Sequence, residues 1–286
     1  MAIAPKNKKM EIKNLFIFLI LIIGIQSCQD TSNPILSLND NFVYPLKIGN
    51  KWNYNVSTVY TNIQPDSIKT LLNDFIFNIQ LSITKDTLLD SNLVYEMKQE
   101  SDDFSDSYAY YSNEEDGFLK YGYSNGPNLG LPKANTIKRF LFKGTYFNSI
   151  TELINKQDET VFAFKKLNDS INFFEQPQKI YVYPFKVGNE WVFSSEYIFI
   201  NKEIVSKELV QISSGIYECF KIKWKFDFDM DGNWDEDFAI YEYVSSKGII
   251  KVTYTIKDIT ITSIENPDGI GKADVKYERV LTSANF

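Results

Sequence analysis

Histidine is absent from the sequence, and this absence excludes several common chemistries. Ser-His-Asp and Cys-His catalysis need an imidazole as general base, and many zinc sites need one as a ligand. Any enzyme activity would therefore depend on carboxylates, as in most glycosidases, where a pair of Asp or Glu residues carries the reaction. The 37 acidic residues offer no means of selecting such a pair. We expect a binding or scaffold protein rather than an enzyme.

A hydrophobic run long enough to span a membrane is missing near the N-terminus. The apolar stretch from Leu15 to Ile25 is shorter than the roughly 18 residues that a transmembrane helix needs. It follows the basic stretch Lys6–Lys13 and precedes Gln26, Ser27 and Cys28. A basic n-region, a short apolar h-region and a small residue at the end are typical of a signal peptide.

Cys28 stands where a bacterial lipobox has its lipidated cysteine, although Ile25-Gln26 departs from the commoner lipobox residues. We predict a signal peptide over residues 1–27, lipidation of Cys28 and a polar tether over residues 28–41. The alternative is an ordinary cleaved signal followed by a cysteine without a role. Lipidation would place the protein in the bacterial cell envelope. Gln29 after the cysteine favours the outer membrane and leaves the face of that membrane open.

Cysteine is otherwise scarce, because Cys219 is the sole other thiol. If Cys28 carries lipid, no intramolecular disulfide can form, even in an oxidising compartment. No histidine is present to activate Cys219, so we interpret this thiol as structural.

Basic residues are outnumbered, and removal of residues 1–27 increases the imbalance. The remainder holds 26 Lys and Arg against 36 Asp and Glu, a formal net charge of −10. Such an acidic body predicts no nucleic-acid partner. It also predicts no basic patch for anionic lipid, so the protein would bind the membrane through its lipid anchor alone.

Alternation of apolar and polar residues dominates the sequence, whereas helical periodicity is scarce. Apolar side chains occupy every second position from Phe75 to Ile83 and again from Phe220 to Phe226. This period of two is typical of half-buried strands. We predict an all-β fold: a curved antiparallel sheet or open half-barrel built from two related β units, with little helix.

An internal repeat supports two units. Residues 44–52 read YPLKIGNKW and residues 183–191 read YPFKVGNEW, with six of nine positions identical. The proline favours an extended entry, the glycine permits a tight turn, and the tryptophan suits a core anchor. The predicted anchors of the two copies are Pro45, Gly49, Trp52, Pro184, Gly188 and Trp191.

A second pair of similar segments, residues 110–120 and 241–251, reads in each case as strand, turn closing on glycine, and strand. Together the two repeats predict a first β unit over residues 42–150 and a second over residues 180–286. Residues 151–179 would connect them.

An acidic segment near the middle of the second unit is the best candidate for an ion site. Residues 227–232 fit the D-x-D-x-D-G start of calcium loops, in which alternate carboxylates converge and glycine permits the sharp turn. An EF-hand is excluded, because position 12 is Phe238 and the flanks read as strands. The candidate calcium ligands are Asp227, Asp229, Asp231, Asn233, Asp235 and Asp237.

The expected hairpin register bears on this site. A hairpin tip at residues 231–233 places Trp224 opposite Ile240. In the same register, Asp227 lies opposite Asp237 and Asp229 lies opposite Asp235. Like charges directly opposed destabilise a hairpin, and a bound calcium ion in a structural role would reverse that penalty. The alternative is a longer, solvated loop in which the carboxylates splay apart.

The repeated P-[LF]-x-[VI]-G-N-x-W elements, with Gly215–Ile222 and Lys247–Lys251, resemble a family of uncharacterised bacterial lipoproteins of the Bacteroidetes type. Its members typically add a G-x-[FY]-x-C-x-x-[VI] strand and a late G-[VI]-G-[LI]-[VI]-K strand; Ser246 replaces the first glycine of the latter. The resemblance covers residues 42–282 and implies no activity. A more distant similarity, at fold level, to carriers of lipoproteins or lipids implies a sheet that cups acyl chains.

Two functions therefore compete. The first is a non-enzymatic envelope lipoprotein that holds a hydrophobic ligand, such as a lipid, in a groove or contacts an envelope protein. The second is a calcium-dependent carbohydrate-binding module or carboxylate-based glycosidase. A concave apolar groove would favour the first, and exposed aromatic rings beside paired carboxylates would favour the second.

Overall fold

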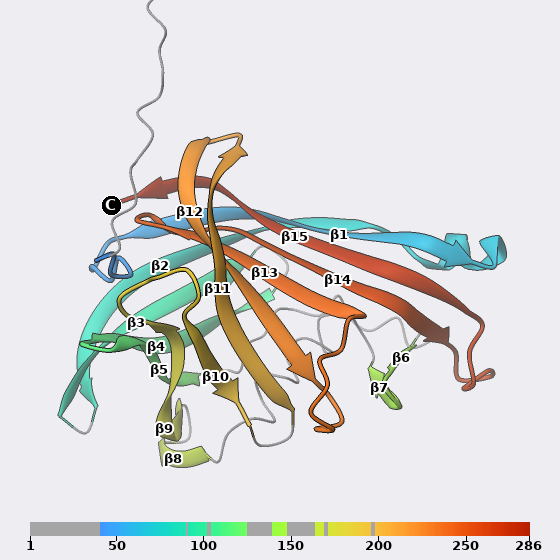
Figure 1. The fold of residues 1–286 in the computed structure, drawn as a ribbon, viewed down its shortest axis with the longest axis horizontal. Helices are drawn as coiled ribbons and strands as arrows, with labels where there is room; N and C mark the ends of the chain where they lie inside the picture. The colour runs from blue at the N-terminus through green and yellow to red at the C-terminus, as the bar shows by residue number, and fades with distance from the viewer. Residues whose placement is uncertain are drawn as a thin grey trace, which may run out of the picture. The chain divides into compact units, whose positions relative to one another are not determined.

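The computed structural model describes residues 41–89, 91–101, 104–124, 139–147, 164–168, 171–195 and 198–286. The predicted signal peptide, Cys28 and nearly all of the predicted tether lie outside these residues. The described residues form an antiparallel sheet of fifteen strands that curves into a nearly closed barrel (Figure 1). The predicted all-β class with little helix is thereby confirmed.

The strands are β1 (Lys51–Gln64), β2 (Phe75–Leu89), β3 (Asn92–Ser101), β4 (Phe104–Glu114), β5 (Gly117–Ser124), β6 (Arg139–Phe142), β7 (Thr145–Phe147), β8 (Phe164–Asn168), β9 (Ile171–Val182), β10 (Glu190–Ser194), β11 (Phe199–Ile212), β12 (Gly215–Asp227), β13 (Phe238–Ser245), β14 (Gly248–Thr262) and β15 (Gly271–Asn285). The helix of the described chain is the short 3₁₀ helix η1 (Asp66–Leu71). Among the described residues, no helix combines the length and the apolar character needed to cross a membrane.

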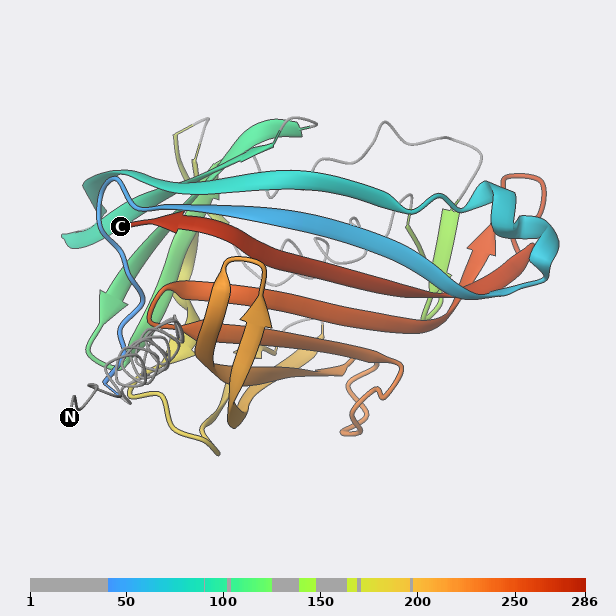
Figure 2. The ribbon, with the colours of Figure 1, turned by 90° about the horizontal axis from the view of Figure 1, so that it is seen from above.

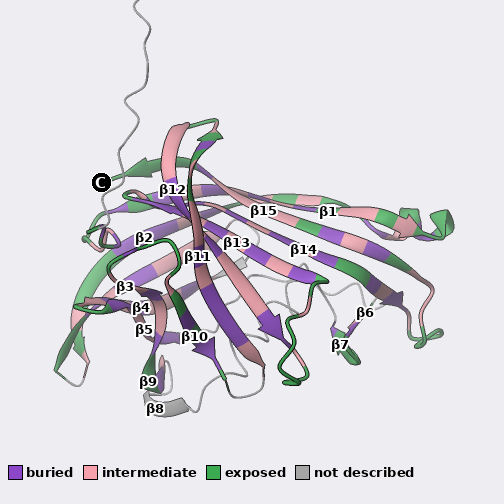
Figure 3. Cartoon of the chain, viewed as in Figure 1, coloured by how far each residue is buried: buried purple, intermediate pink, exposed green. Residues whose placement is uncertain are grey.

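Alternating burial explains why these segments form strands. Along β14, buried residues such as Ile250, Val252 and Tyr254 alternate with half-buried ones (Figure 3). Successive side chains of a strand point to opposite faces, so this pattern turns one face of the sheet inward. The β-branched and aromatic residues that fill these strands suit a half-buried pleated surface.

Strand order divides the sheet into two meanders. The main path runs β10-β11-β12-β13-β14-β15-β1-β2-β3-β4-β5-β9-β8. We call β1–β5 with β9 the first meander and β10–β14 with β15 the second; each is a run of six neighbouring strands. The meanders join through the ladder between β15 and β1, and Figure 2 shows these long strands side by side with β2 and β14. The segment predicted as a connector contains β8 and most of β9.

The strand β10 at one end of the sheet approaches β9, the neighbour of the other end strand β8, without a described ladder between β9 and β10. Side chains connect them instead: the indole of Trp191 donates to the carbonyl of Lys179 at 3.3 Å, and the ammonium of Lys202 donates to the carbonyl of Ile180 at 3.4 Å. Side-chain hydrogen bonds therefore bridge β9 and the β10–β11 hairpin where the nearly closed barrel has no described ladder.

The two copies of the nine-residue element adopt the same local geometry. Gly49 and Gly188 have φ angles of +94° and +92°, which L side chains rarely adopt. Each glycine N–H donates to an isoleucine carbonyl one strand away, on Ile83 and Ile204 respectively. In both copies the asparagine side chain donates to the proline carbonyl at 2.9 Å, on Pro45 and Pro184.

The tryptophans of the two copies are the second residues of β1 and β10, and both are buried. The indole N–H of Trp52 donates to the carbonyl of Lys247 at 2.6 Å, so the first copy is tied to the second meander. This geometry fits a packing role for both tryptophans.

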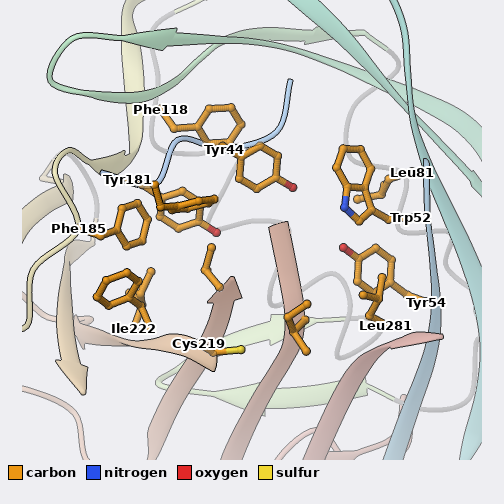
Figure 4. Close-up of a cluster of buried hydrophobic side chains, with 14 of the residues drawn as sticks. Tyr44, Trp52, Tyr54, Leu81, Phe118, Tyr181, Phe185, Cys219, Ile222 and Leu281 are labelled. Carbon is orange, nitrogen blue, oxygen red and sulfur yellow. The ribbon is translucent and has the colours of Figure 1, made fainter. Parts of the chain in front are cut away.

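Buried side chains form two clusters. One contains Trp52, Tyr54, Tyr181 and Phe185, which Figure 4 shows gathered on the inner side of the sheet. The other lies along β12–β15 and includes residues of η1 and of the β6–β7 hairpin, which pairs with β14. Between the walls of the barrel the inner face is not filled completely.

Candidate functional site

The inner face of the curved sheet lines a cavity of about 250 Å³. Both meanders contribute to its walls, with β2, β3, β4, β5 and β9 from the first and β10 to β15 from the second. Tyr44, from the first repeated element, also reaches it. A cavity that both meanders build is a property of the closed sheet, so neither meander would form it alone.

One wall of the cavity is aromatic. The ring of Phe118 stacks on Tyr44 with centroids 4.4 Å apart and on Tyr111 at 4.9 Å. Tyr181 extends the stack at 5.8 Å from Phe118, and Figure 4 shows Phe118, Tyr44 and Tyr181 grouped together. Offset aromatic stacks of this kind give a rigid apolar surface.

Charged side chains occupy the other parts of the lining. Lys202 is 1% exposed, and its ammonium lies 3.6 Å from the ring centroid of Trp224 and 4.4 Å from that of Phe193. The Glu242 carboxylate lies 3.7 Å away. Aromatic faces and a carboxylate both stabilise a desolvated cation, which explains how an ammonium is held here.

Arg279 and Tyr181 remain protonated at this site. Burial alone lowers the pKa of Arg279. The larger, opposite effect comes from the neighbouring phenols of Tyr277 and Tyr54 and from the Glu242 carboxylate, so the net shift is upward. Burial raises the pKa of the Tyr181 phenol well above its usual value, and the Glu242 charge adds to this. Both groups are therefore hydrogen-bond donors at neutral pH.

Five polar atoms of the lining are buried and make no hydrogen bond of good geometry in the described chain, although the Tyr181 phenol and the Glu242 carboxylate are close enough to interact. Four are on donor groups and one is a carboxylate oxygen: Gln178 Nε2, Tyr181 Oη, Trp224 Nε1, Arg279 Nε and Glu242 Oε2. Buried polar groups in native proteins are nearly always satisfied, and an unsatisfied one costs about 1–3 kcal/mol. Their concentration on one cavity makes this the leading candidate site.

Sequence reasoning missed this site, although a signal was present. Lys202 lies between Ile200 and Ile204 on the inner face of β11, and Glu242 lies between Ile240 and Val244 on that of β13. A charged residue at an inward position of an apolar alternation breaks the pattern of a core strand. With Lys120 of β5 and Arg279 of β15, the charges of the lining come from four strands of both meanders. Local spacing in the sequence does not reveal that assembly.

The acidic segment forms a loop between β12 and β13 that brings three of its six predicted ligands together. One carboxylate oxygen each of Asp227, Asp229 and Asp231 lie within 4.8 Å of one another. Asp227 is buried, and its two oxygens accept the backbone N–H groups of Asp231 at 3.1 Å and Gly232 at 2.9 Å. Hydrogen bonds from Asn233 to the Asp231 carboxylate lower the pKa of Asp231.

The remaining acidic residues of the loop are placed differently. Trp224 pairs with Ile240, as the hairpin register predicts, but that pair is the last of the β12–β13 ladder. Asp235 forms an ion pair with Lys143 of the β6–β7 turn and accepts the N–H of Phe228 at 2.9 Å. The ammonium of Lys143 thus supplies positive charge that the hairpin register predicts for calcium. Asp237 is exposed.

We propose that Asp227, Asp229 and Asp231 bind a calcium ion, because carboxylate oxygens suit a hard cation. Calorimetric titration should give a Kd of about 10⁻⁴–10⁻³ M, the range of weak extracellular sites. The double variant Asp229→Asn with Asp231→Asn should abolish binding, and Lys143→Met should tighten it by removing a competing ammonium. Asp268→Asn, in the distant β14–β15 turn, is the control. Equal heats from the double variant and the wild type would refute the site.

Cys219 has the properties of a structural thiol. It is fully buried, and its Sγ lies 3.7 Å from the carbonyl of Tyr217. Burial raises the pKa of the Cys219 thiol to about 12, and the charges of Glu208 and Glu218 contribute to this shift. A thiol that stays protonated is a poor nucleophile.

No family model and no curated protein matches the chain. Two solved structures are similar to it. One is a protein inferred to be exported, with a YmcC-like fold, from Bacteroides fragilis; it is 12% identical with a TM-score of 0.35, and the match covers 86% of this chain and 100% of that one. The other is an inferred lipoprotein from Parabacteroides distasonis, 13% identical with a TM-score of 0.35, over 86% and 99% of the two chains. Both similarities are too distant to indicate a function.

Proposed function

We propose that this protein is a lipid-anchored component of the bacterial cell envelope that binds a small molecule inside its barrel without transforming it. The anchor rests on the short apolar run and on Cys28 directly behind it. A lipid on Cys28 would hold the acidic body at a membrane surface through a polar tether. The outer membrane is the expected location.

The cavity with its five unpartnered polar atoms carries the binding part of the proposal. A well-packed core would fill this space with apolar side chains, because voids and unsatisfied polar groups both reduce stability. Ligand sites, in contrast, combine an apolar lining with a few placed polar groups. The aromatic stack of Tyr44 and Phe118 beside the charges of Lys202 and Arg279 has this character.

Binding is favoured over hydrolysis by the number of carboxylates at the cavity. Among the described residues that line it, Glu242 is the sole carboxylic acid. A glycosidase of the common type needs two, about 5–10 Å apart across the scissile bond. With no histidine in the chain, a second acid–base group of the usual kind is also missing from this site.

A calcium-dependent carbohydrate-binding module is the second candidate, and one observation favours it. Trp234 lies in the acidic loop, is 38% exposed, and stacks on Phe199 with centroids 5.6 Å apart. An exposed indole beside oxygen ligands is a suitable platform for a sugar ring. Sugar binding that chelators abolish would support this candidate over the cavity.

Native mass spectrometry of the Cys28→Ser protein, produced in a bacterial envelope and purified without detergent, tests the proposal. Loss of the acylated thiol should move the protein from the membrane fraction to the soluble fraction. Its gentle-ionisation spectrum should show a mass above that of the polypeptide, which disappears on denaturation. The variant Ala109→Trp fills the cavity and should carry no such ligand, whereas Ala239→Trp, at a residue outside the cavity lining, should retain it.

Two results would contradict the proposal. Continued membrane association of Cys28→Ser would count against the lipid anchor. A polypeptide mass alone, or a bound mass that Ala109→Trp leaves unchanged, would count against the cavity as the binding site.

A further inference from the structure

The cavity is lined by more positive than negative charge. Its lining includes Lys120, Lys202 and Arg279 but a single carboxylate, Glu242. Lys120, Lys202 and Glu242 are 8%, 1% and 7% exposed, so water does little to screen them. An excess of buried positive charge is unusual in a chain whose formal net charge is −7. Its position, on the inner face of the barrel, calls for a specific cause.

The fold itself does not require these charges. Trp52 pairs with Leu81 in the first meander, and the equivalent Trp191 pairs with Lys202 in the second. The same register shift follows in both, after Ile83 and after Ile204. The first meander therefore builds the same backbone with leucine where the second has lysine.

Glu242 gives the same comparison. In the similar segments 110–120 and 241–251, its counterpart is Tyr111, an aromatic residue of the cavity wall. Replacing a buried ion pair by apolar residues is often neutral or stabilising. Stability alone therefore does not explain a lysine and a glutamate at these two positions.

The chain satisfies a buried carboxylate fully where no cavity is involved. Glu96 is 6% exposed, accepts hydrogen bonds from Thr84 at 2.7 Å and Tyr110 at 2.9 Å, and pairs with Lys85 at 3.1 Å. Glu242, in contrast, has an oxygen that accepts no hydrogen bond of good geometry: Lys202 lies 3.7 Å from it, and the Tyr181 phenol interacts with the carboxylate only weakly. The chain can thus satisfy a buried acid fully, and at the cavity it does not do so for Glu242.

Most of the unpartnered groups at the cavity are donors. Gln178 Nε2, Trp224 Nε1 and Arg279 Nε can only donate, and the protonated Tyr181 phenol can donate as well. Such donors, together with the excess positive charge, are complemented by a group with several acceptor oxygens and a negative charge. The aromatic stack on Phe118 complements an apolar group attached to it.

We propose that the ligand of the cavity is an organic oxyanion, a carboxylate or phosphate ester joined to an apolar group. This inference rests on the proposed binding function and specifies its ligand class. Arg279, Lys120 and Gln178 donate to the oxyanion. Glu242 keeps Lys202 in place, and the apolar group packs on the stacked rings. The charge of the ligand lowers the cost of the buried cations, so binding stabilises the fold.

Calorimetric titration of the Cys28→Ser protein with probes that share one alkyl chain tests this inference. Octanoate and octyl phosphate should bind at least about tenfold more tightly than 1-octanol, the gain expected of one charge-assisted hydrogen bond. Octyltrimethylammonium should not bind. Inorganic phosphate should bind more weakly than octyl phosphate, because it lacks the apolar group.

Variants assign the discrimination to the cavity. Arg279→Met and, independently, Lys120→Met should reduce octanoate affinity about tenfold or more and leave 1-octanol binding unchanged. Lys276→Met, an exposed residue of the same strand as Arg279, is the matched control. Circular dichroism verifies that each variant is folded. If Arg279→Met does not fold, Lys120→Met still tests the inference.

The possible failures are distinguishable. Equal affinity for 1-octanol and octanoate would overturn the oxyanion inference and leave the binding function standing. Binding of octyltrimethylammonium more tightly than octanoate would do the same. Binding of inorganic phosphate as tightly as octyl phosphate would show that the ligand needs no apolar group. If no probe binds and no molecule co-purifies, the proposed function itself is wrong.

Discussion

Replacing Glu242 by leucine should lower the free energy of unfolding by about 3–5 kcal/mol, the usual cost of removing one partner of a buried ion pair. Lys202, which is 1% exposed, would lose the carboxylate 3.7 Å from its ammonium. Contacts such as those with the ring of Trp224 and the carbonyl of Ile180 do not replace it, because neither group carries a full negative charge. Urea denaturation followed by circular dichroism measures the effect.

The double variant Glu242→Leu with Lys202→Leu is the control for this prediction. It leaves no isolated charge, and leucine already occupies the equivalent position in the first meander, at Leu81. Most of the lost stability should therefore return. A double variant as unstable as the single one would show that packing, rather than the uncompensated ammonium, determines the loss.

Trp52→Ala should cost about 3–5 kcal/mol, which is typical of a fully buried tryptophan. Trp52 is 0% exposed, lies on β1 between β15 and β2, and donates to the carbonyl of Lys247 at 2.6 Å. Its loss opens a large cavity and removes a bond between the two meanders. Trp52→Phe should cost less, because it removes the hydrogen bond but retains most of the buried area.

Trp191→Ala offers an internal comparison, because it is the same residue in the second copy of the repeat. Trp191 lies on β10, the end strand of the sheet, and its hydrogen bond to Lys179 is longer, at 3.3 Å. We expect a loss at the lower end of the range, about 3 kcal/mol. A larger loss for Trp191→Ala than for Trp52→Ala would contradict the expectation that the tryptophan on a central strand stabilises the sheet more than the one on its end strand.

Local patterns in the sequence were sufficient to predict the class of fold and part of the register. Alternation over residues 75–83 and 220–226 identifies strands because side chains of a strand alternate between two faces. The same period places Trp224 opposite Ile240, as observed. Antiparallel hairpins are local, so a few residues of pattern determine each of them.

The candidate site was not predictable in this way, because its parts are distant in sequence. Lys202, Glu242 and Arg279 come together through the closure of the sheet, which no local spacing encodes. The two residues of the ion pair between Asp235 and Lys143 are similarly distant in sequence, so the acidic segment gives no sign of its basic neighbour. Charges at inward positions were the available signal, and their partners could be identified only in three dimensions.

The approach of β9 and β10 also matters for the behaviour of the protein at high concentration. A strand at the end of a sheet presents unpaired backbone N–H and C=O groups, which can recruit a strand from another molecule and start aggregation. Here the end strand β10 lies against β9, and the Trp191 and Lys202 side chains occupy carbonyl groups of β9. The strand β10 at one end of the sheet is thus sheltered by β9, although no ladder joins the two.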